Sequence, residues 1–428
     1  MPDTTISRVR ARQVWDSRGR PTVEAEVWLA GGSVGRAIAP AGASRGTQEA
    51  LDLRDGGPQL GGMGVSKAVA HVNAEIGRLL IGRNSERQAE IDDALIALDG
   101  TPNKSRLGGN ALIATSMAVL HATAGAHRMP LWKYLAQGAD VALPLPEIQI
   151  FGGGAHAGRR VDVQDFMVVA LSAASFAEAL AVTAEVYRAA GDLMKESGKL
   201  QGVADEGGYW PAFDANEEAL ATLSRAIERA GYTPGVQVGI SLDVAASEFG
   251  RNGRYRLGLE GRELDSDGMC EMLLGWVERY PIISIEDPLA EDDAAGMRRF
   301  TAAVGDRVQV IGDDFLTTSA ARVRQAAAGG ACNAVLIKPN QAGTVSETRA
   351  AFEAGRAAGF GTIVSARSGE TEDTTIVHLA VGWNAGQLKV GSFSRSERMA
   401  KWNEALRIEE ALGARARFAG RKVLPGQH

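Results

Sequence analysis

The sequence has little cysteine and no long uninterrupted apolar run. Its 428 residues include two cysteines, Cys270 and Cys332, whose spacing fits neither a metal site nor a redox pair. The most apolar stretch, residues 111–126, is interrupted by Thr115 and Ser116 and falls short of the ~18 apolar residues of a membrane span. The opening residues MPDTTISRVR contain no apolar signal core. These absences predict a soluble protein of the reducing cytoplasm.

An excess of positive charge is also missing. Lys and Arg number 46 against 52 Asp and Glu, and the formal net charge is −6. This balance argues against nucleic acid and against an anionic membrane as partners. Hydrophobic residues make up 45% of the chain, which is enough for a substantial core, and 428 residues predict two domains.

The first part of the chain differs in pattern from the rest. Residues 23–29 (VEAEVWL) alternate apolar and polar side chains, as a half-exposed antiparallel strand does. Helical periodicity follows over residues 65–81, 86–98 and 111–128. This mixture predicts a small α+β domain. Because the proline-containing run 143–147 (LPLPE) disfavours a continuous helix, we expect domains of residues 1–140 and 141–428.

In the second part, six short apolar segments each run up to a charged residue. They are residues 240–243 (ISLD), 282–286 (IISIE), 308–313 (VQVIGD), 334–338 (AVLIK), 361–367 (GTIVSAR) and 387–389 (QLK). The segments between them are long enough for a loop and a helix, which begins at a capping residue in many cases. A strand buried on both faces holds a charge only where it leaves the core. The pattern predicts an α/β fold, a (β/α) barrel with its active site at the carboxyl ends of the strands.

Three of these strand ends carry carboxylates, Asp243, Glu286 and Asp313. Three adjacent negative charges repel one another strongly unless a cation lies among them. Oxygen ligands without His or Cys select a hard ion, and we expect Mg²⁺. The alternative is three separate, solvated acids.

Basic residues end the later strands. A depressed pKa, produced by neighbouring cations, would make Lys338 or Lys389 a usable general base. Each lysine alone is more often a surface cation whose stem covers apolar surface. Arg367 and Ser368 offer a guanidinium fork and a hydroxyl suited to a phosphate.

Further candidates lie on loops. Glu206, in the tight loop 205–208 (DEGG), could protonate a leaving group. Gln164 and Asp165 stand at the start of another candidate strand. His156 lies in the glycine-rich segment FGGGAHAGRR, which could close over an anion. A lone histidine or a lone glycine-rich loop is weak evidence for a site.

Across residues 9–420 the chain resembles the enolase family. The resemblance rests on residues 16–24 (DSRGRPTVE), 42–44 (GAS), 205–208 (DEGG), 284–289 (SIEDPL), 340–347 (NQAGTVSE), 367–373 (RSGETED) and 395–401 (RSERMAK). It implies an α+β capping domain followed by an enolase-type (β/α)8 barrel of order ββαα(βα)6. It also implies a homodimer or a dimer-based octamer, and Mg²⁺-dependent dehydration of a 2-phosphoglycerate-type hydroxy acid to an enol ester.

The resemblance gives two Mg²⁺ ions per active site. Asp243, Glu286 and Asp313 would hold the first ion, which binds the substrate carboxylate. Ser44 would help to hold the second ion between the capping domain and the phosphoryl group. The two ions and Lys389 would stabilise the aci-carboxylate dianion.

The resemblance also assigns the proton transfers. Lys338 would abstract the C2 proton, and Glu206 would act as general acid on the C3 hydroxyl. Arg367 and Ser368 would bind the phosphoryl oxygens.

Several positions depart from the family pattern, among them Gly153 and Ala155, where asparagine and serine are usual, and Pro339, where a valine-like residue is usual. Ala366 stands where enolases carry histidine, Asp165 where they carry glutamate, and Arg45 where they carry threonine. An ~1 Å misplacement in a preorganised site can cost about a hundredfold in rate. The departures favour a specialised paralogue acting on a bulkier, more anionic phosphorylated or phosphonylated hydroxy acid, with Arg45 pairing with the added charge. Carboxyphosphonoenolpyruvate synthase, of phosphonate (phosphinothricin-type) biosynthesis, is an enolase relative of this kind.

Two alternatives remain. The first is a housekeeping glycolytic enolase in which these positions have drifted. The second is a non-catalytic, enolase-derived binding protein, which predicts eroded metal ligands and lysines, whereas all of them are present.

Overall fold

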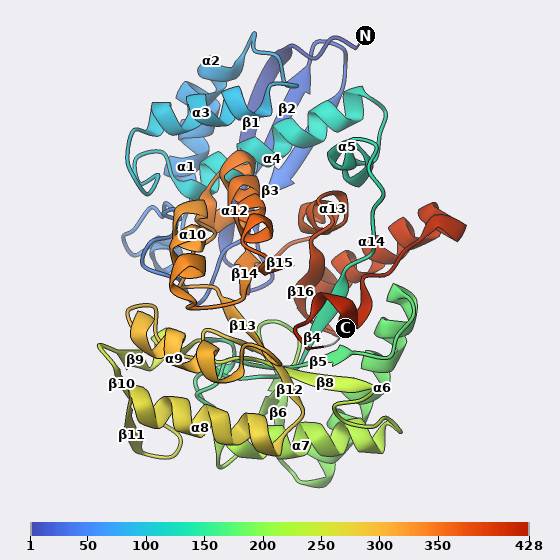
Figure 1. Ribbon diagram of the computed structural model, residues 1–428. Coiled ribbons are helices and arrows are strands. Elements are labelled where there is room, and N and C mark those ends of the chain that lie inside the picture. Colours follow the sequence, from blue (N-terminus) through green and yellow to red (C-terminus); the bar gives the residue numbers. More distant parts are fainter. Residues whose placement is uncertain (1, 427–428) are drawn as a thin grey trace.

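The computed structural model describes residues 2–426; residue 1 and residues 427–428, which the predicted domains include, lie outside the described part. The chain begins with a three-stranded antiparallel sheet of β1 (Ile6–Trp15), β2 (Pro21–Leu29) and β3 (Val34–Ile38). Six helical segments follow, η1 (Gln59–Gly62), α1 (Ser66–His71), α2 (Gly77–Leu80), α3 (Gln88–Asp99), α4 (Gly109–Ala126) and α5 (Leu131–Ala136), with a π-helical turn, η2 (Val72–Ile76), joining α1 to α2. We call the unit from β1 to α5 the cap; it lies above the barrel in Figure 1.

Helix α4 forms the centre of the cap. It packs against β2 and β3 and is apolar around most of its circumference, so nearly all of its residues are buried. Gly35 makes this close packing feasible, because a Cβ there would collide with the backbone of Ala118 and Ala122. The expectation that β2 is half exposed is wrong, since only Glu26 and Trp28 in it are partly exposed.

Eight strands close into a barrel. They are β4 (Leu145–Gly152), β5 (Asp165–Ala170), β8 (Val238–Asp243), β12 (Ile282–Glu286), β13 (Gln309–Gly312), β14 (Ala334–Ile337), β15 (Gly361–Ser365) and β16 (Gly386–Ser392). Pairing of β16 with β4 completes the ring. Strand β5 is antiparallel to both of its neighbours, β4 and β8, and the remaining barrel pairs are parallel.

The helices cover the outside of the barrel. They are α6 (Phe176–Glu196), α7 (Asn216–Arg229), α8 (Ser266–Arg279), α9 (Ala294–Val304), α10 (Ala320–Gly329), α12 (Val345–Ala357), α13 (Thr375–Gly382) and α14 (Ser396–Leu412). The order β4-β5-α6-α7 followed by six strand–helix units confirms the predicted ββαα(βα)6 barrel. Among residues 2–426, no helix combines the length and the apolar content needed to cross a membrane.

Short elements decorate the barrel. They are η3 (Gly154–Ala157), β6 (Leu200–Val203), β7 (Tyr209–Pro211), η4 (Ala246–Glu248), β9 (Gly250–Arg251), β10 (Arg254–Leu257), β11 (Arg262–Asp265), α11 (Pro339–Ala342), η5 (Gly413–Arg415) and η6 (Gly420–Val423). Strands β6 and β7 form a hairpin beside β4, and β9 to β11 form a separate small sheet.

The prediction that charged residues stand at the carboxyl ends of the barrel strands is confirmed for four strands and corrected for one. Asp243 and Glu286 are the last residues of β8 and β12, and Asp313 and Lys338 directly follow β13 and β14. Lys389, by contrast, lies inside β16, which continues to Ser392. The strand tolerates this buried charge because the lysine meets carboxylates from neighbouring strands.

The cap contacts the barrel through polar groups as well as apolar ones. Ala41 of the cap and Gly369, beyond β15, form an antiparallel bridge. Asp92 of α3 is fully buried and accepts hydrogen bonds from Ser346 at the start of α12 and from Ser116 of α4. Burial is the main reason why the pKa of Asp92 rises to about 6.

Asp92 therefore makes the stability of the folded chain depend on pH. The folded state holds this proton more tightly than the unfolded state, so wild type loses stability as pH rises through about 6. Relative to Asp92→Asn, we expect wild type to lose about 1.4 kcal/mol between pH 5 and pH 8. Urea denaturation of both proteins at the two pH values measures this difference. A gap between the two proteins that is independent of pH contradicts the prediction.

Candidate active site

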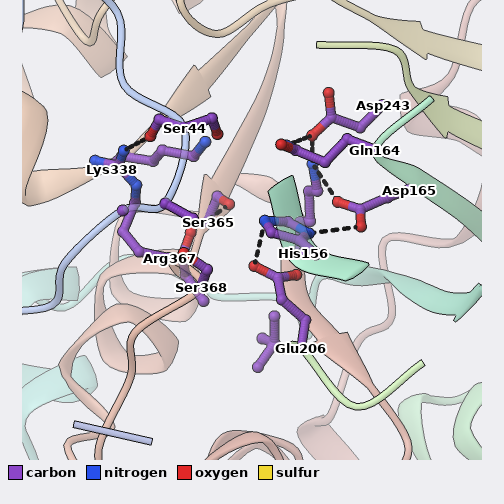
Figure 2. A pocket seen from close by; sticks show the side chains of 15 residues that line it. Ser44, His156, Gln164, Asp165, Glu206, Asp243, Lys338, Ser365, Arg367 and Ser368 are labelled. Atoms are coloured by element: carbon purple, nitrogen blue, oxygen red, sulfur yellow. Dashed lines mark hydrogen bonds and ion pairs between the residues drawn. The ribbon is translucent and has the colours of Figure 1, made fainter. Parts of the chain in front are cut away.

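A pocket lies at the barrel mouth, where the carboxyl ends of the strands face the cap. Its cavity volume is about 10 Å³, and its wall includes cap residues of the segment 42–44. Eleven of the fourteen predicted site residues line it: Ser44, His156, Gln164, Asp165, Glu206, Asp243, Lys338, Ala366, Arg367, Ser368 and Lys389. Figure 2 shows most of them converging on one space. Glu286 and Asp313 lie behind the two lysines, and Arg45 lies elsewhere.

The lysines and carboxylates form one buried charge cluster. Lys389 Nζ lies 2.6 Å from Glu286 Oε2 and 2.9 Å from Asp243 Oδ2. Lys338 Nζ donates to Asp313 Oδ2. All five side chains are almost fully buried, so the charges neutralise one another in a medium of low polarity.

The predicted depression of the lysine pKa values depends on a bound metal ion, because the protein's own groups act in the opposite direction. Burial would lower the pKa of both lysines, but the facing carboxylates outweigh it and raise both values. The strongest carboxylate is Asp313 for Lys338 and Asp243 for Lys389. Neither lysine is a base while these ion pairs persist.

The carboxylates fit a divalent cation. Burial and the neighbouring Asp243 raise the pKa of Glu286 well above its usual range, which shows that the two lysines leave negative charge crowded here. Glu286 Oε1 is buried and has no hydrogen-bond partner among residues 2–426. An all-oxygen donor set with a free carboxylate oxygen suits Mg²⁺. Ser44 reaches the same pocket from the cap loop.

A second ionisable group lies on the opposite wall. His156 Nδ1 lies 3.0 Å from Asp165 Oδ1, and His156 Nε2 lies 3.7 Å from Glu206 Oε1. Burial alone would lower the pKa of His156, but Asp165 and Glu206 raise it to about 9. His156 is therefore a cation between two carboxylates at neutral pH.

The direction of β5 explains how Asp165 reaches the site. Because β5 is antiparallel to β8, its first residue pairs with Asp243, the last residue of β8. Gln149 of β4 donates to Asp165 Oδ1, and Gln164 Nε2 donates to Asp243 Oδ2 at 3.0 Å. Gln164 and Asp165, at the start of β5, thus connect His156 with Asp243 through hydrogen bonds.

Arg367 does not present its guanidinium fork to the pocket as expected. Its Nη1 and Nη2 donate to both carboxylate oxygens of Glu49, at 3.0 and 3.1 Å. The same nitrogens also donate to Asn340 Oδ1 and to the Ser44 carbonyl, at 3.1 and 2.9 Å. The predicted bidentate contact with a phosphoryl group therefore competes with Glu49 of the cap.

Several residues that were not predicted form hydrogen bonds to the predicted site residues. Gln341 Nε2 donates to Asp313 Oδ1 at 2.8 Å and to Glu49 Oε1 at 3.3 Å, which links the carboxylate cluster to the cap loop. Arg18 and Gln341 lie within the enolase-like motifs 16–24 and 340–347, so the resemblance could have indicated them. Glu49 and Gln149 lie outside these motifs and carry no local signal.

Arg45 is not brought to this pocket. It is exposed and lines a neighbouring cavity of about 390 Å³ whose wall also includes Glu248, Glu291 and Asp292. The next residue, Gly46, packs closely against Thr317 and Asp314, which fixes the course of the loop. Ala366, by contrast, does line the pocket, beside Arg367.

Comparison with known proteins agrees with this architecture. The family model for the enolase C-terminal TIM barrel domain matches residues 140–426, and that for the enolase N-terminal domain matches residues 6–135. The chain belongs to the enolase family. It is 52% identical over 421 residues to "Enolase 1" of Desulfitobacterium hafniense (strain Y51), covering 98% of this chain and 96% of that protein. This enolase-family chain is therefore an enolase-superfamily lyase.

Mg²⁺ should stabilise the folded protein through the carboxylate cluster. At a concentration a hundredfold above its Kd, we expect about 2.7 kcal/mol of added stability. Glu286→Gln removes one anionic ligand, so the added stability should fall sharply at the same Mg²⁺ concentration. Denaturation with and without Mg²⁺ measures the effect, and Glu278→Gln, on the exposed face of α8, is the matched control. Equal Mg²⁺ responses in the two variants would exclude Glu286 as a ligand.

Proposed function

We propose that this lyase removes a proton from C2 of a 2-phosphoglycerate-type hydroxy acid and expels the C3 hydroxyl, forming an enolpyruvate ester. The observation that carries the proposal is that Lys338 and Glu206 line the same pocket, together with Asp243 of the carboxylate cluster (Figure 2). One wall offers a candidate base, and the other offers a carboxyl beside a cationic histidine.

Lys338 is the proposed base. It abstracts a proton only after it loses its own, which its ion pair with Asp313 opposes. Asp243, Glu286 and Asp313 would hold one Mg²⁺, and Ser44 would contribute to a second. When bound, the ions supply positive charge that replaces the lysine beside Asp313 and polarises the substrate carboxylate. Lys389 would remain a cation facing the charge that develops on that carboxylate.

Glu206 is the proposed general acid. It must be protonated to act on the departing hydroxyl. In the folded chain, however, burial, which would raise the pKa of Glu206, is outweighed by nearby cations that lower it, above all His156, whose Nε2 lies 3.7 Å from Glu206 Oε1. Asp165 holds His156 from the other side through Nδ1. Arg367 and Ser368 would bind the phosphoryl oxygens, with Gln164 fixing the Asp243 carboxylate.

The substrate has two candidates. The first is a bulkier, more anionic 2-phosphoglycerate analogue, phosphorylated or phosphonylated, as in phosphonate biosynthesis of the carboxyphosphonoenolpyruvate synthase type. The small side chain of Ala366 in the pocket wall favours it, whereas Arg45, in its separate cavity, lends it no support. The second is 2-phosphoglycerate itself, as in glycolysis, favoured by the 52% identity to a protein named "Enolase 1".

The proposal extends to the setting of the enzyme. It comprises a capping domain of residues 1–140, a barrel domain of residues 141–428, and a homodimer or dimer-based octamer. The ranges of the two family models support this division. A cytoplasmic location is part of the proposal, supported by a small phosphorylated substrate and by two cysteines that are buried free thiols.

Replacing the proposed base should stop proton abstraction. We expect Lys338→Met to lower kcat and the exchange of the C2 proton with deuterated solvent by roughly 100- to 10,000-fold. NMR follows the exchange separately from elimination, and Lys133→Met, an exposed position on α5, is the control. Exchange at the wild-type rate in Lys338→Met would show that another group is the base.

A direct assay decides between the two substrates. With Mg²⁺ and 2-phosphoglycerate, we expect kcat/KM below ~10⁴ M⁻¹s⁻¹, the lower end for efficient enzymes, because Ala366 and Asp165 alter the pocket. Ultraviolet absorbance of the enol ester reports turnover. A value at or above that range selects 2-phosphoglycerate and excludes the specialised substrate.

A further inference from the structure

The turn between β1 and β2 lies directly against the pocket wall, although the proposed chemistry uses none of its residues. Ser17 N donates to the Glu370 carbonyl at 2.8 Å. Ala41 N donates to the Gly369 carbonyl, and Gly369 N donates to the Ala41 carbonyl. A side chain at Gly369 would collide with Asp16 and Arg18. The cap turn and the loop after β15 are therefore packed as one unit.

Ser17 Oγ donates to the Ser368 carbonyl at 3.3 Å, and Arg18 is the residue of this turn that contacts the Ser368 side chain. Its Nη1 donates to Ser368 Oγ at 3.1 Å. Its Nη2 donates to the Ala41 carbonyl at 2.8 Å and to Asp16 Oδ2 at 3.3 Å. The side chain is 5% exposed, so these bonds fix its position behind Ser368.

The contact determines how Ser368 can bond to a ligand. A hydroxyl has one hydrogen and two oxygen lone pairs. Because the guanidinium donates into the Ser368 oxygen, the hydroxyl hydrogen is not needed there and can be donated into the pocket that Ser368 lines. An anion in that pocket can then accept a hydrogen bond from the Ser368 hydroxyl, which the positive charge of Arg18 strengthens. Without this arrangement the anion could face a lone pair of the Ser368 oxygen.

Arg18 also retains unneutralised charge. Burial is the main cause that lowers the pKa of Arg18, and only part of this effect is reversed by Asp16. Its Nε is buried and has no hydrogen-bond partner in the part of the chain that the structure describes.

We propose that Arg18 is a positioning residue that holds Ser368 as a donor toward the phosphoryl or phosphonyl group of the substrate. The identification of that group rests on the proposed function, but the binding of an anion by Ser368 does not. Through this contact the cap takes part in substrate selection in addition to the contribution of Ser44.

Inorganic phosphate, in the presence of Mg²⁺, is the probe. We expect Arg18→Gln to weaken its binding by about 10- to 100-fold, the effect of a lost charged hydrogen bond. Ser368→Ala should weaken it comparably. In the Ser368→Ala background, Arg18→Gln should add less than about threefold, because Arg18 acts through Ser368. Isothermal titration calorimetry of the four full-length proteins measures these values.

Turnover gives a second readout. With a substrate that the enzyme turns over, Arg18→Gln should raise KM with a smaller change in kcat, since a contact remote from C2 stabilises ground and transition states alike. Arg20→Gln, exposed on the same turn, is the matched control and should resemble wild type. Arg18→Lys, which keeps the charge, should recover part of the loss and replaces Arg18→Gln if that variant does not fold.

Three results overturn the proposal. One is an Arg18→Gln protein, or the Arg18→Lys protein in its place, that binds phosphate like wild type or like Arg20→Gln. Another is a full multiplicative loss in the double variant, which would show that Arg18 acts independently of Ser368. The third is the absence of phosphate binding by wild type. Phosphate binding without turnover of either candidate substrate refutes the proposed function alone and leaves this inference standing.

Discussion

Mutual neutralisation of five buried charges at the barrel mouth is the constraint on which the structure depends. Asp243, Glu286, Asp313, Lys338 and Lys389 come from five different strands or strand ends. An ionised side chain buried without a partner costs several kcal/mol, so each strand must deliver its charge to the same place. A slip of one residue in any strand would turn its charge toward the helices. The strand register that closes the barrel is therefore the same register that brings the charged site residues together.

The sequence predicts the parts of the site that follow from this constraint. An apolar run that ends on Asp243 or Glu286 can be read without knowledge of the fold, because only a strand end tolerates the charge. The position of Asp165 cannot be read in this way, since nothing local distinguishes antiparallel β5 from a parallel strand. The position of Arg45 outside the pocket cannot be predicted from local sequence either. The contacts of Gly46 with the distant Thr317 set the direction of its loop.

The lysine charges show why burial alone does not make a base. Lys338 and Lys389 were expected to lose proton affinity near other cations, but in the folded chain the nearest charges are carboxylates. These lysines act as counter-ions that keep Asp243 and Asp313 ionised and low in pKa against the effect of burial. In the proposed mechanism, a divalent cation bound by Asp313 would lower the proton affinity of Lys338. Cation binding and proton abstraction are therefore thermodynamically linked through one carboxylate.

The two departures from the family pattern inside the pocket differ in consequence. Asp165 has a shorter side chain than the family's glutamate, yet it remains paired with His156 and receives a hydrogen bond from Gln149. The group that assists departure of the hydroxyl is thus still assembled. Ala366 has no polar side-chain atom to offer to a ligand beside Ser368. Of the two departures, Ala366 is therefore the one through which the proposed change of substrate would act.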